Sequence, residues 1–297
     1  MGKGFRLLAL LLATLLAPFS PVCQACPYCR ADAAGLTGSN ASALEQEEDW
    51  PLKISGGLDV PSAYFFRGYQ QADRGLILQP YLNVFTTHSY DGFVVSPYVS
   101  VFNSTNFDEN RMGDMFDAMV GGVTSWNGAV LDVRYAYYNM SPLMRSNVHE
   151  IGGRLSYDAL NLLIGTDGSR PFQVKTFGGV YGELSDENGT DDLFLNVGFE
   201  PACRFKVASR PAGLSLPTEW GLSGDGYYLD SSGNNATFGY FSTALSGTIS
   251  LASTESRGEW LLNSSLQYLH LGAASTRAVN GGDRDECIAK IGLSFVY

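Results

Sequence analysis

The sequence is poor in charged residues and in histidine for its length. Only 16% of its 297 residues are Asp, Glu, Lys or Arg, and only three are His. The 30 acidic residues outnumber the 19 basic ones, which gives a formal net charge of -11. A nucleic-acid-binding protein needs a basic patch or stripe, so this charge balance argues against a nucleic-acid partner.

The sequence also lacks an apolar run long enough for a membrane helix, which needs about 20 residues. Its clearest apolar run, residues 7–17, is shorter and follows Lys3 and Arg6. A short basic region before such a run predicts a secretory signal peptide over residues 1–25, and the alternative is a buried N-terminal helix. We therefore expect an exported protein without membrane helices.

Cysteine is scarce, and two of the five cysteines form a Cys-x-x-Cys motif, Cys26 to Cys29. Redox chemistry by such a pair needs a helix N-terminus in a strand–helix–strand unit, and the small and polar residues that follow do not predict one. A local disulfide and lipid attachment at Cys26 both remain open. Residues 26–52 are predicted to be a flexible periplasmic segment.

Glycine and aromatic residues are abundant, with 34 Gly, 17 Phe and 16 Tyr. From about residue 53, apolar and polar side chains alternate with a period of two, which predicts β-strands. Each segment has ten or more residues, enough to cross a membrane when tilted. We expect about twelve strands, near 54–68, 75–87, 92–103, 114–126, 129–139, 147–158, 171–184, 192–205, 215–228, 237–250, 259–271 and 286–297.

The last strand shows how its two faces differ. Ile291 and Leu293 share one parity, Lys290 and Ser294 share the other, and the sequence ends on an aromatic. This is typical of outer-membrane barrels, in which the apolar face contacts lipid and the polar face lines a lumen. Phe295 and Tyr297 would then belong to the aromatic girdle at the membrane boundary.

The fold class predicted is all-β, a single up-and-down antiparallel transmembrane β-barrel of about 12 strands over residues 53–297. Tight turns at Asp91-Gly92 and Asn127-Gly128 alternate with longer polar gaps, which matches short periplasmic turns and long outer loops. Residues 159–170, on the side of the tight turns, break this pattern. A secreted β-sandwich or soluble barrel also alternates, with its polar face outward, and stays an alternative.

Ionised side chains share the parity opposite to the apolar residues in each segment. A basic side chain on the lipid face at mid-bilayer would cost about 2–4 kcal/mol, so we assign the ionised face to the lumen. The predicted lumen-facing charged residues are Asp59, Arg67, Asp117, Asp132, Arg134, Glu150, Arg154, Lys175, Glu183, Glu200, Glu219 and Lys290.

One segment carries a family resemblance. Residues 63–71 read Ala-Tyr-Phe-Phe-Arg-Gly-Tyr-Gln-Gln, and residues 78–81 read Leu-Gln-Pro-Tyr. They resemble the first hairpin of the TorF-like porin family of exported bacterial barrels, which typically runs Ser-x-Tyr-x-Phe-Arg-Gly-x-Ser-Gln. Arg67, Gly68, Gln70 or Gln71, and Gln79 match this pattern, whereas Tyr69 and Pro80 depart from it. The resemblance implies an outer-membrane barrel of around twelve strands and little chemistry.

Several candidate sites carry less weight. Arg67 is expected near the outer rim, either clamping the first loop or lining a constriction. His149 and His270 have outward parity near outer strand ends, as a lipid hydrolase would require, but no serine partner can be read from spacing. We expect no catalytic, cofactor or metal site. Cys203 and Cys287 are expected to be too far apart for a disulfide and therefore free.

The sequence favours a channel that passes ions or small solutes by diffusion, with charged lumen residues setting selectivity. If acidic residues dominate the constriction, cations should be favoured. A structural or surface-interaction barrel with a closed lumen, and a membrane-embedded lipid hydrolase, are the alternatives. Expected partners are outer-membrane lipid, the barrel assembly machinery through the C-terminal strand, and the small solutes themselves.

Overall fold

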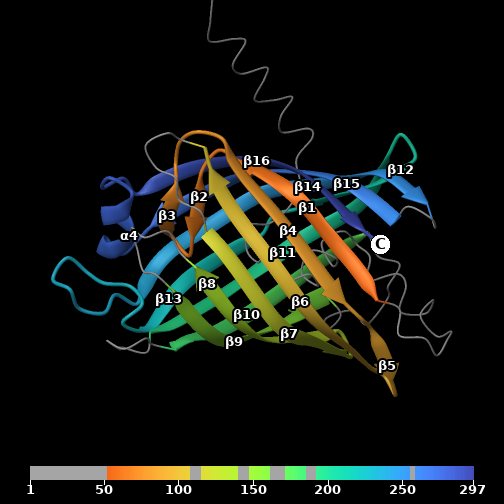
Figure 1. Ribbon diagram of the computed structural model, residues 1–297, viewed down its shortest axis with the longest axis horizontal. Helices are drawn as coiled ribbons and strands as arrows, with labels where there is room; N and C mark the ends of the chain where they lie inside the picture. Colours follow the sequence, from red (N-terminus) through yellow and green to blue (C-terminus); the bar gives the residue numbers. More distant parts are fainter. Residues whose placement is uncertain (1–51, 108–114, 140–146, 161–170, 185–191, 255–257) are drawn as a thin grey trace, which may run out of the picture.

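The computed structural model describes residues 52–107, 115–139, 147–160, 171–184, 192–254 and 258–297, and its fold is an antiparallel β-barrel (Figure 1). The expected signal peptide and the Cys26–Cys29 motif lie outside these residues. Among the described helices, none is long and apolar enough to cross a membrane.

The wall has twelve strand positions, which confirms the predicted fold class. β12 and β13 share one position, interrupted at Leu216 and Pro217, and β5 (His88–Tyr90) is a short arm on β6. The wall strands are β1 (Lys53–Pro61), β4 (Ile77–Phe85), β6 (Phe93–Asn106), β7 (Met115–Trp126), β8 (Ala129–Asn139), β9 (Val148–Asp158), β10 (Phe172–Leu184), β11 (Leu193–Val207), β12 (Arg210–Ser215), β13 (Thr218–Asp225), β14 (Phe238–Thr254), β15 (Gly258–Leu271) and β16 (Asp285–Val296).

Pairing between the first and last strands closes the barrel. β1 runs antiparallel to β16, from Ser55 opposite Val296 to Pro61 opposite Lys290. The other neighbouring strands are also antiparallel, and β11 joins β10 on one side and β12 and β13 on the other. A closed wall leaves no sheet edge, which is the condition for a sheet surrounded by hydrocarbon.

The two ends of the barrel differ in their connections. At one end, here called the turn end, Asp91-Gly92 and Asn127-Gly128 make tight turns with positive φ at both residues, as predicted. At the opposite end, the loop end, the connections are longer than these turns, although the connection of residues 159–171 between β9 and β10 is a long one at the turn end. The loop-end connections include residues 226–237 between β13 and β14, and α4 (Ala274–Val279) between β15 and β16.

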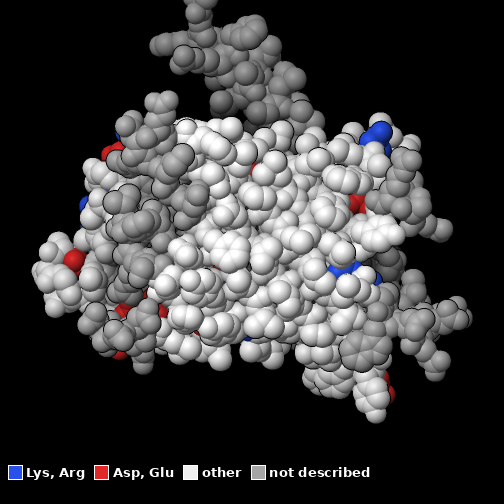
Figure 2. Space-filling model, in the orientation of Figure 1, with Lys and Arg blue, Asp and Glu red and all other residues white. Residues whose placement is uncertain are grey.

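The outer face is apolar and the inner face is polar. On β7 and β8, Val120 is 52% and Val133 is 48% exposed, whereas Asp132 is only 5% exposed. Figure 2 shows the outer face in this view as a broad area of uncharged side chains, with most visible Lys, Arg, Asp and Glu toward the two ends. The parity assigned from the sequence therefore matches the burial pattern of these strands.

The first predicted strand, 54–68, is wrong in its second half. β1 ends at Pro61, and the next residues form a separate two-stranded sheet of β2 (Tyr64–Phe66) and β3 (Tyr69–Ala72). Proline has no N–H for the ladder, which favours an exit from the wall there. The hairpin lies inside the barrel, because Tyr64 and Ala72 pack in a buried cluster with inward side chains of β4 and β6–β9.

Two adjacent glycines of β7 test the assignment of inner and outer faces. A Cβ on Gly121 would lie 2.7 Å from the Val133 carbonyl oxygen and from the Tyr98 ring, whereas a Cβ on Gly122 would meet nothing within 4 Å. We expect Gly121→Ala to lower the free energy of unfolding by about 1–3 kcal/mol through overpacking. The matched Gly122→Ala should change it by less than about 0.5 kcal/mol. Urea unfolding of the refolded protein measures both, and equal effects would contradict the assigned faces.

Candidate functional site

The charged residues predicted to line the lumen lie on inward-facing positions, and most are less than 10% exposed. These are Asp59, Asp117, Asp132, Arg134, Glu150, Arg154, Glu183, Glu219 and Lys290. The Arg67 side chain is 7% exposed. Lys175 and Glu200 are half-buried and sit opposite each other on β10 and β11. Their part in solute passage stays a prediction.

Arg67 lies on the inner hairpin and not at the rim of a wall strand. It forms the turn between β2 and β3 together with Gly68, with φ of 50° and 80°. Its Nη1 lies 2.6 Å from Oε2 of Glu150, whose side chain is fully buried on β9. Tyr138 on β8 donates a hydrogen bond of 3.0 Å to the other oxygen of Glu150, so both carboxylate oxygens are engaged.

Aromatic rings surround the guanidinium group of Arg67. Its Cζ lies 4.2 Å from the ring centre of Phe194, 4.9 Å from that of Tyr181 and 5.5 Å from that of Tyr227. Phe66, from the hairpin itself, adds a fourth ring at 5.0 Å. We call Glu150, Tyr181, Phe194 and Tyr227 the Arg67 cage. A cation this close to several ring faces is attracted by their quadrupoles.

Glycines on the wall make room for the cage. Glu150, Tyr181 and Phe194 occupy inward positions on the adjacent strands β9, β10 and β11. A Cβ on Gly152 would lie 2.2 Å from Cδ1 of Tyr181, and one on Gly179 would lie 2.8 Å from Cε2 of the same ring. The absence of side chains at these two positions therefore lets the Tyr181 ring lie flat along the wall.

The loop-end connections hold the hairpin from the other side. Tyr69 donates a hydrogen bond of 2.7 Å to the carbonyl oxygen of Tyr227, and Tyr228 donates one of 2.9 Å to that of Arg67. The rings of Tyr69 and Tyr228 stack at 5.8 Å, and Ser275 of α4 lies 3.1 Å from the Tyr69 hydroxyl. The strand predicted over 215–228 instead spans 210–225 as β12 and β13, so Tyr227 and Tyr228 belong to the loop.

The loop-end half of the lumen is filled by packed side chains. Tyr64 of the hairpin lies 6.0 Å from Phe102, and Phe66 lies 5.2 Å from Tyr138, measured between ring centres. Met115 accepts a hydrogen bond from the Tyr64 hydroxyl at its sulfur atom. This half of the barrel has an apolar and aromatic core, which the polar lumen expected from the sequence did not include.

The interior also carries paired charges and a polar network on the wall itself. Lys290 Nζ lies 2.9 Å from Asp59 Oδ2, and Tyr98 donates a hydrogen bond of 2.8 Å to Asp132. Amide and hydroxyl groups bond one another nearer the turn end, as Asn263 does with Ser294 at 2.7 Å. These residues are each less than 10% exposed, so the network lies on the inner, not the lipid-facing, surface of the wall, and most buried polar groups are hydrogen-bonded in this way.

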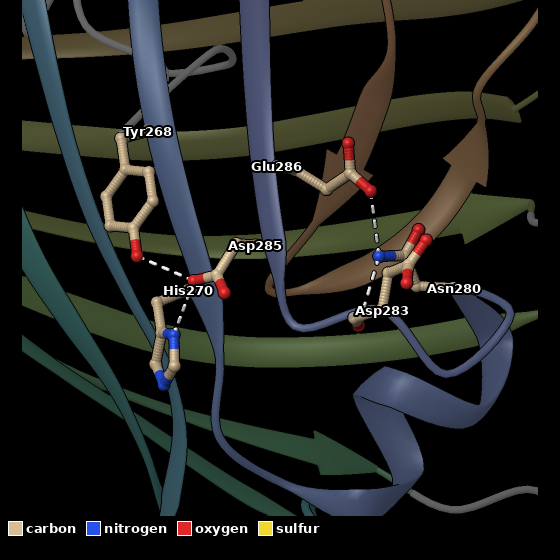
Figure 3. Close-up of polar contacts among 6 residues, drawn as sticks. All are labelled: Tyr268, His270, Asn280, Asp283, Asp285 and Glu286. Carbon is tan, nitrogen blue, oxygen red and sulfur yellow. Dashed lines mark hydrogen bonds and ion pairs between the residues drawn. The ribbon is translucent and has the colours of Figure 1, made fainter.

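His270 lies on the outer face near the loop end, as its parity predicted. Figure 3 shows its Nδ1 and the Tyr268 hydroxyl both directed at Asp285, where they approach Oδ1 at 2.8 Å and 2.6 Å. In the same view, Asn280 donates hydrogen bonds to the Asp283 carbonyl and to Glu286. The second set ties the segment after α4 to the start of β16.

The two outward histidines, His149 and His270, contact aromatic side chains. His149 lies 2.5 Å from the Tyr135 hydroxyl and packs near the Tyr137 ring, whereas His270 stacks on Phe238. Within the described ranges, neither imidazole hydrogen-bonds to a serine hydroxyl. A nucleophile beside the imidazole is what such catalysis requires.

The described residues contain no group of His, Cys, Asp or Glu suited to a metal ion. Cys203 on β11 and Cys287 on β16 are free thiols, which confirms the prediction that they are not joined. The sequence favours a solvated loop over a loose cation site for the acidic segment 186–192, of which residues 186–191 lie outside the described residues.

No protein-family model and no curated protein matches the sequence. Comparison with solved structures finds a bacterial polysaccharide outer membrane secretin (8% identity, TM-score 0.44, covering 84% of this chain and 99% of that chain). It also finds the KdgM porin (7%, 0.41, 82% and 98%) and an outer membrane channel from Pseudomonas putida F1 (11%, 0.40, 85% and 97%). At these low values neither the fold nor the function rests on them, and the resemblance of residues 63–71 to the TorF-like porin family stays a prediction.

Because Glu150 is the buried counter-charge of Arg67, we expect the substitution Glu150→Gln to lower stability strongly. Glu150→Gln would leave the buried guanidinium without its counter-charge, and we expect a loss of about 3–5 kcal/mol in the free energy of unfolding. The control is Arg74→Ala, because the Arg74 side chain is 73% exposed beside Asp73 and such pairs contribute about 0–1 kcal/mol. Urea unfolding measures both, and a neutral Glu150→Gln would show that the pair does not hold the hairpin.

Proposed function

We propose that the protein is a bacterial outer-membrane β-barrel that provides a passive path for cations or small solutes. In the conformation described above, the hairpin β2–β3 closes the loop end of this path. The observation that supports the proposal is a closed wall with an apolar outer face and an ionised inner face. Membership of the TorF-like porin family is part of the proposal and rests on residues 63–71.

The outer face supports a membrane environment. Val99, Val120, Ile151 and Leu155 are each 52–56% exposed near the middle of their strands. A water-soluble barrel would place polar side chains there, since large contiguous apolar patches are rare on soluble monomers. A lipid bilayer solvates such a surface without cost.

Aromatic residues lie on the outer face at both ends of this apolar band. At the turn end, Phe93 stacks on Trp126 at 5.6 Å, and Trp260 packs against Phe295 at 5.3 Å. At the loop end, Tyr135 and Tyr268 occupy outward positions beside the two histidines. Two such girdles are typical of transmembrane barrels, with the turn end toward the periplasm.

The charges around the hairpin support cation preference. Asp117, Glu150 and Glu183 are buried in the loop-end half of the lumen, and Arg67 arrives there on the hairpin. Arg134 lies on the wall and is partnered by Asp132 at 3.6 Å. When the hairpin withdraws, it removes a positive charge and leaves the carboxylates, which attract cations.

A structural barrel with a permanently closed lumen is the second candidate. The packing of Tyr64, Phe66 and Tyr69 against wall and loop residues favours it, because these contacts fill the loop-end half of the lumen. The two candidates differ in whether the hairpin can leave this position.

A substitution on the outer face tests the membrane environment. Val120→Arg places a charge near the middle of the apolar band, and we expect it to lower the free energy of unfolding from lipid vesicles by about 2–4 kcal/mol. Val120→Leu keeps the position apolar and should cost less than about 1.5 kcal/mol. Urea titration of vesicle-inserted protein measures both variants. An Arg variant as stable as the Leu variant would contradict lipid contact at this position.

Single-channel recording in planar bilayers tests the path. We expect low or intermittent conductance for the intact protein and larger, steady conductance when residues 62–75 are replaced by a short Gly-Ser linker. Reversal potentials in a KCl gradient should show cation preference. A variant that folds into a barrel but does not conduct after the replacement would support the closed structural barrel. Anion preference would contradict the assigned selectivity.

A further inference from the structure

The guanidinium of Arg67 occupies a site that other parts of the chain build. The hairpin β2–β3 forms its own two-stranded sheet. Among the described residues, no backbone–backbone hydrogen bond joins residues 63–75 to the wall strands. Side chains therefore hold the hairpin, and Arg67 is the only one of them that carries a charge into the cage.

The chemistry of the cage is that of an organic-cation site. Glu150 supplies a carboxylate fixed by the Tyr138 hydroxyl, and the three rings of Tyr181, Phe194 and Tyr227 come from β10, β11 and the loop after β13. A carboxylate with several ring faces is how proteins recognise guanidinium and alkylammonium groups. The guanidinium group of Arg67 contacts this carboxylate and these rings in the way that the guanidinium group of a bound ligand would.

A second buried carboxylate adds to this preference. Asp117 is 3% exposed, and its Oδ1 has no hydrogen-bond partner among the residues that the structure describes. It lies opposite Tyr138 in the β7–β8 register, next to the residue that fixes Glu150. The Tyr181 ring already has one guanidinium beside it, since Cζ of Arg134 lies 4.9 Å from its ring centre. Arg134 is paired with Asp132 at 3.6 Å, so its charge is balanced on the wall.

We propose that the Arg67 cage is a binding site for a small organic cation bearing a guanidinium or amino group, which competes with Arg67. Displacement of Arg67 breaks its ion pair with Glu150 and its 3.4 Å hydrogen bond to the Tyr227 hydroxyl. The hairpin then keeps only its aromatic packing and tyrosine hydrogen bonds, which favours its release from the wall. The release step rests on the proposed channel function. The binding site itself does not, because it depends only on the cage residues.

Chemical rescue tests the binding site. Arg67→Ala empties the cage, and we expect its thermal unfolding midpoint in detergent, followed by heat-modified gel mobility, to fall by about 10 °C. Millimolar ethylguanidinium chloride should restore most of this loss, whereas sodium chloride at the same concentration should not. If the variant folds poorly, its refolding yield with and without ethylguanidinium reports the same binding.

Two control variants make the rescue specific. Arg74→Ala removes an exposed arginine and should show neither the loss nor the rescue. The double variant Arg67→Ala/Glu150→Gln keeps the rings but loses the carboxylate, and ethylguanidinium should rescue it at least tenfold less effectively. Absence of rescue, or equal rescue in the double variant, would overturn the cation site.

Conductance separates the site from the release step. Ethylguanidinium added to the loop-end side of a bilayer should raise the open probability of the intact barrel severalfold. Rescue of Arg67→Ala without any change in conductance would support the cation site and overturn the release of the hairpin. A conducting barrel without rescue would leave the channel standing and overturn the site.

Discussion

The structure depends on the opposite polarity of the two faces of one closed wall. Period-two alternation places Val120, Val133 and the other apolar residues of the same parity outside, and it places the ionised residues inside. Closure of β1 on β16 satisfies the backbone, so the outer face needs no polar groups. Every charge assigned to the wall must then find its partner within the barrel, and this requirement shapes the interior.

The inner hairpin meets that requirement in the loop-end half. β1 leaves the wall at Pro61, and the turn at Arg67 and Gly68 brings a guanidinium to the buried Glu150. The same excursion carries Tyr64 and Phe66 into the lumen, where they pack on the wall. This one change of direction after Pro61 thus neutralises a buried carboxylate and fills the loop-end half of the lumen. A channel and a closed barrel differ only in how firmly these contacts hold.

Much of the fold could be predicted from the sequence because strand parity is a local signal. The twelve strand positions, the tight turns at Asp91-Gly92 and Asn127-Gly128, and the outward parity of His270 all follow from alternation and turn chemistry. Parity does not distinguish a strand of the wall from a strand that lies in the lumen. Tyr64 and Phe66 continue the pattern of β1 beyond Pro61, so alternation alone predicts the hairpin as part of the wall, although Pro61 and Gly68 mark the break.

The cage was beyond sequence reasoning for a different reason. Its members, at residues 150, 181, 194 and 227, are distant along the chain from one another and from Arg67, and the barrel closure and the hairpin bring them together. Arg67, Glu150 and the inward parity of β9 could be assigned individually. Tyr227 could not, because the strand before it ends at Asp225 and the loop folds back over the lumen.

Spin-label accessibility along β8 tests whether the apolar face of the wall contacts lipid and the ionised face does not. Single cysteines at positions 131–136, in a background with Cys26, Cys29, Cys203 and Cys287 replaced by serine, would be labelled with a nitroxide in lipid vesicles. We expect frequent collision with membrane-dissolved oxygen at positions 131, 133 and 135 and rare collision at positions 132, 134 and 136. Oxygen contact at the second set, or no alternation at all, would show that the apolar face does not meet hydrocarbon.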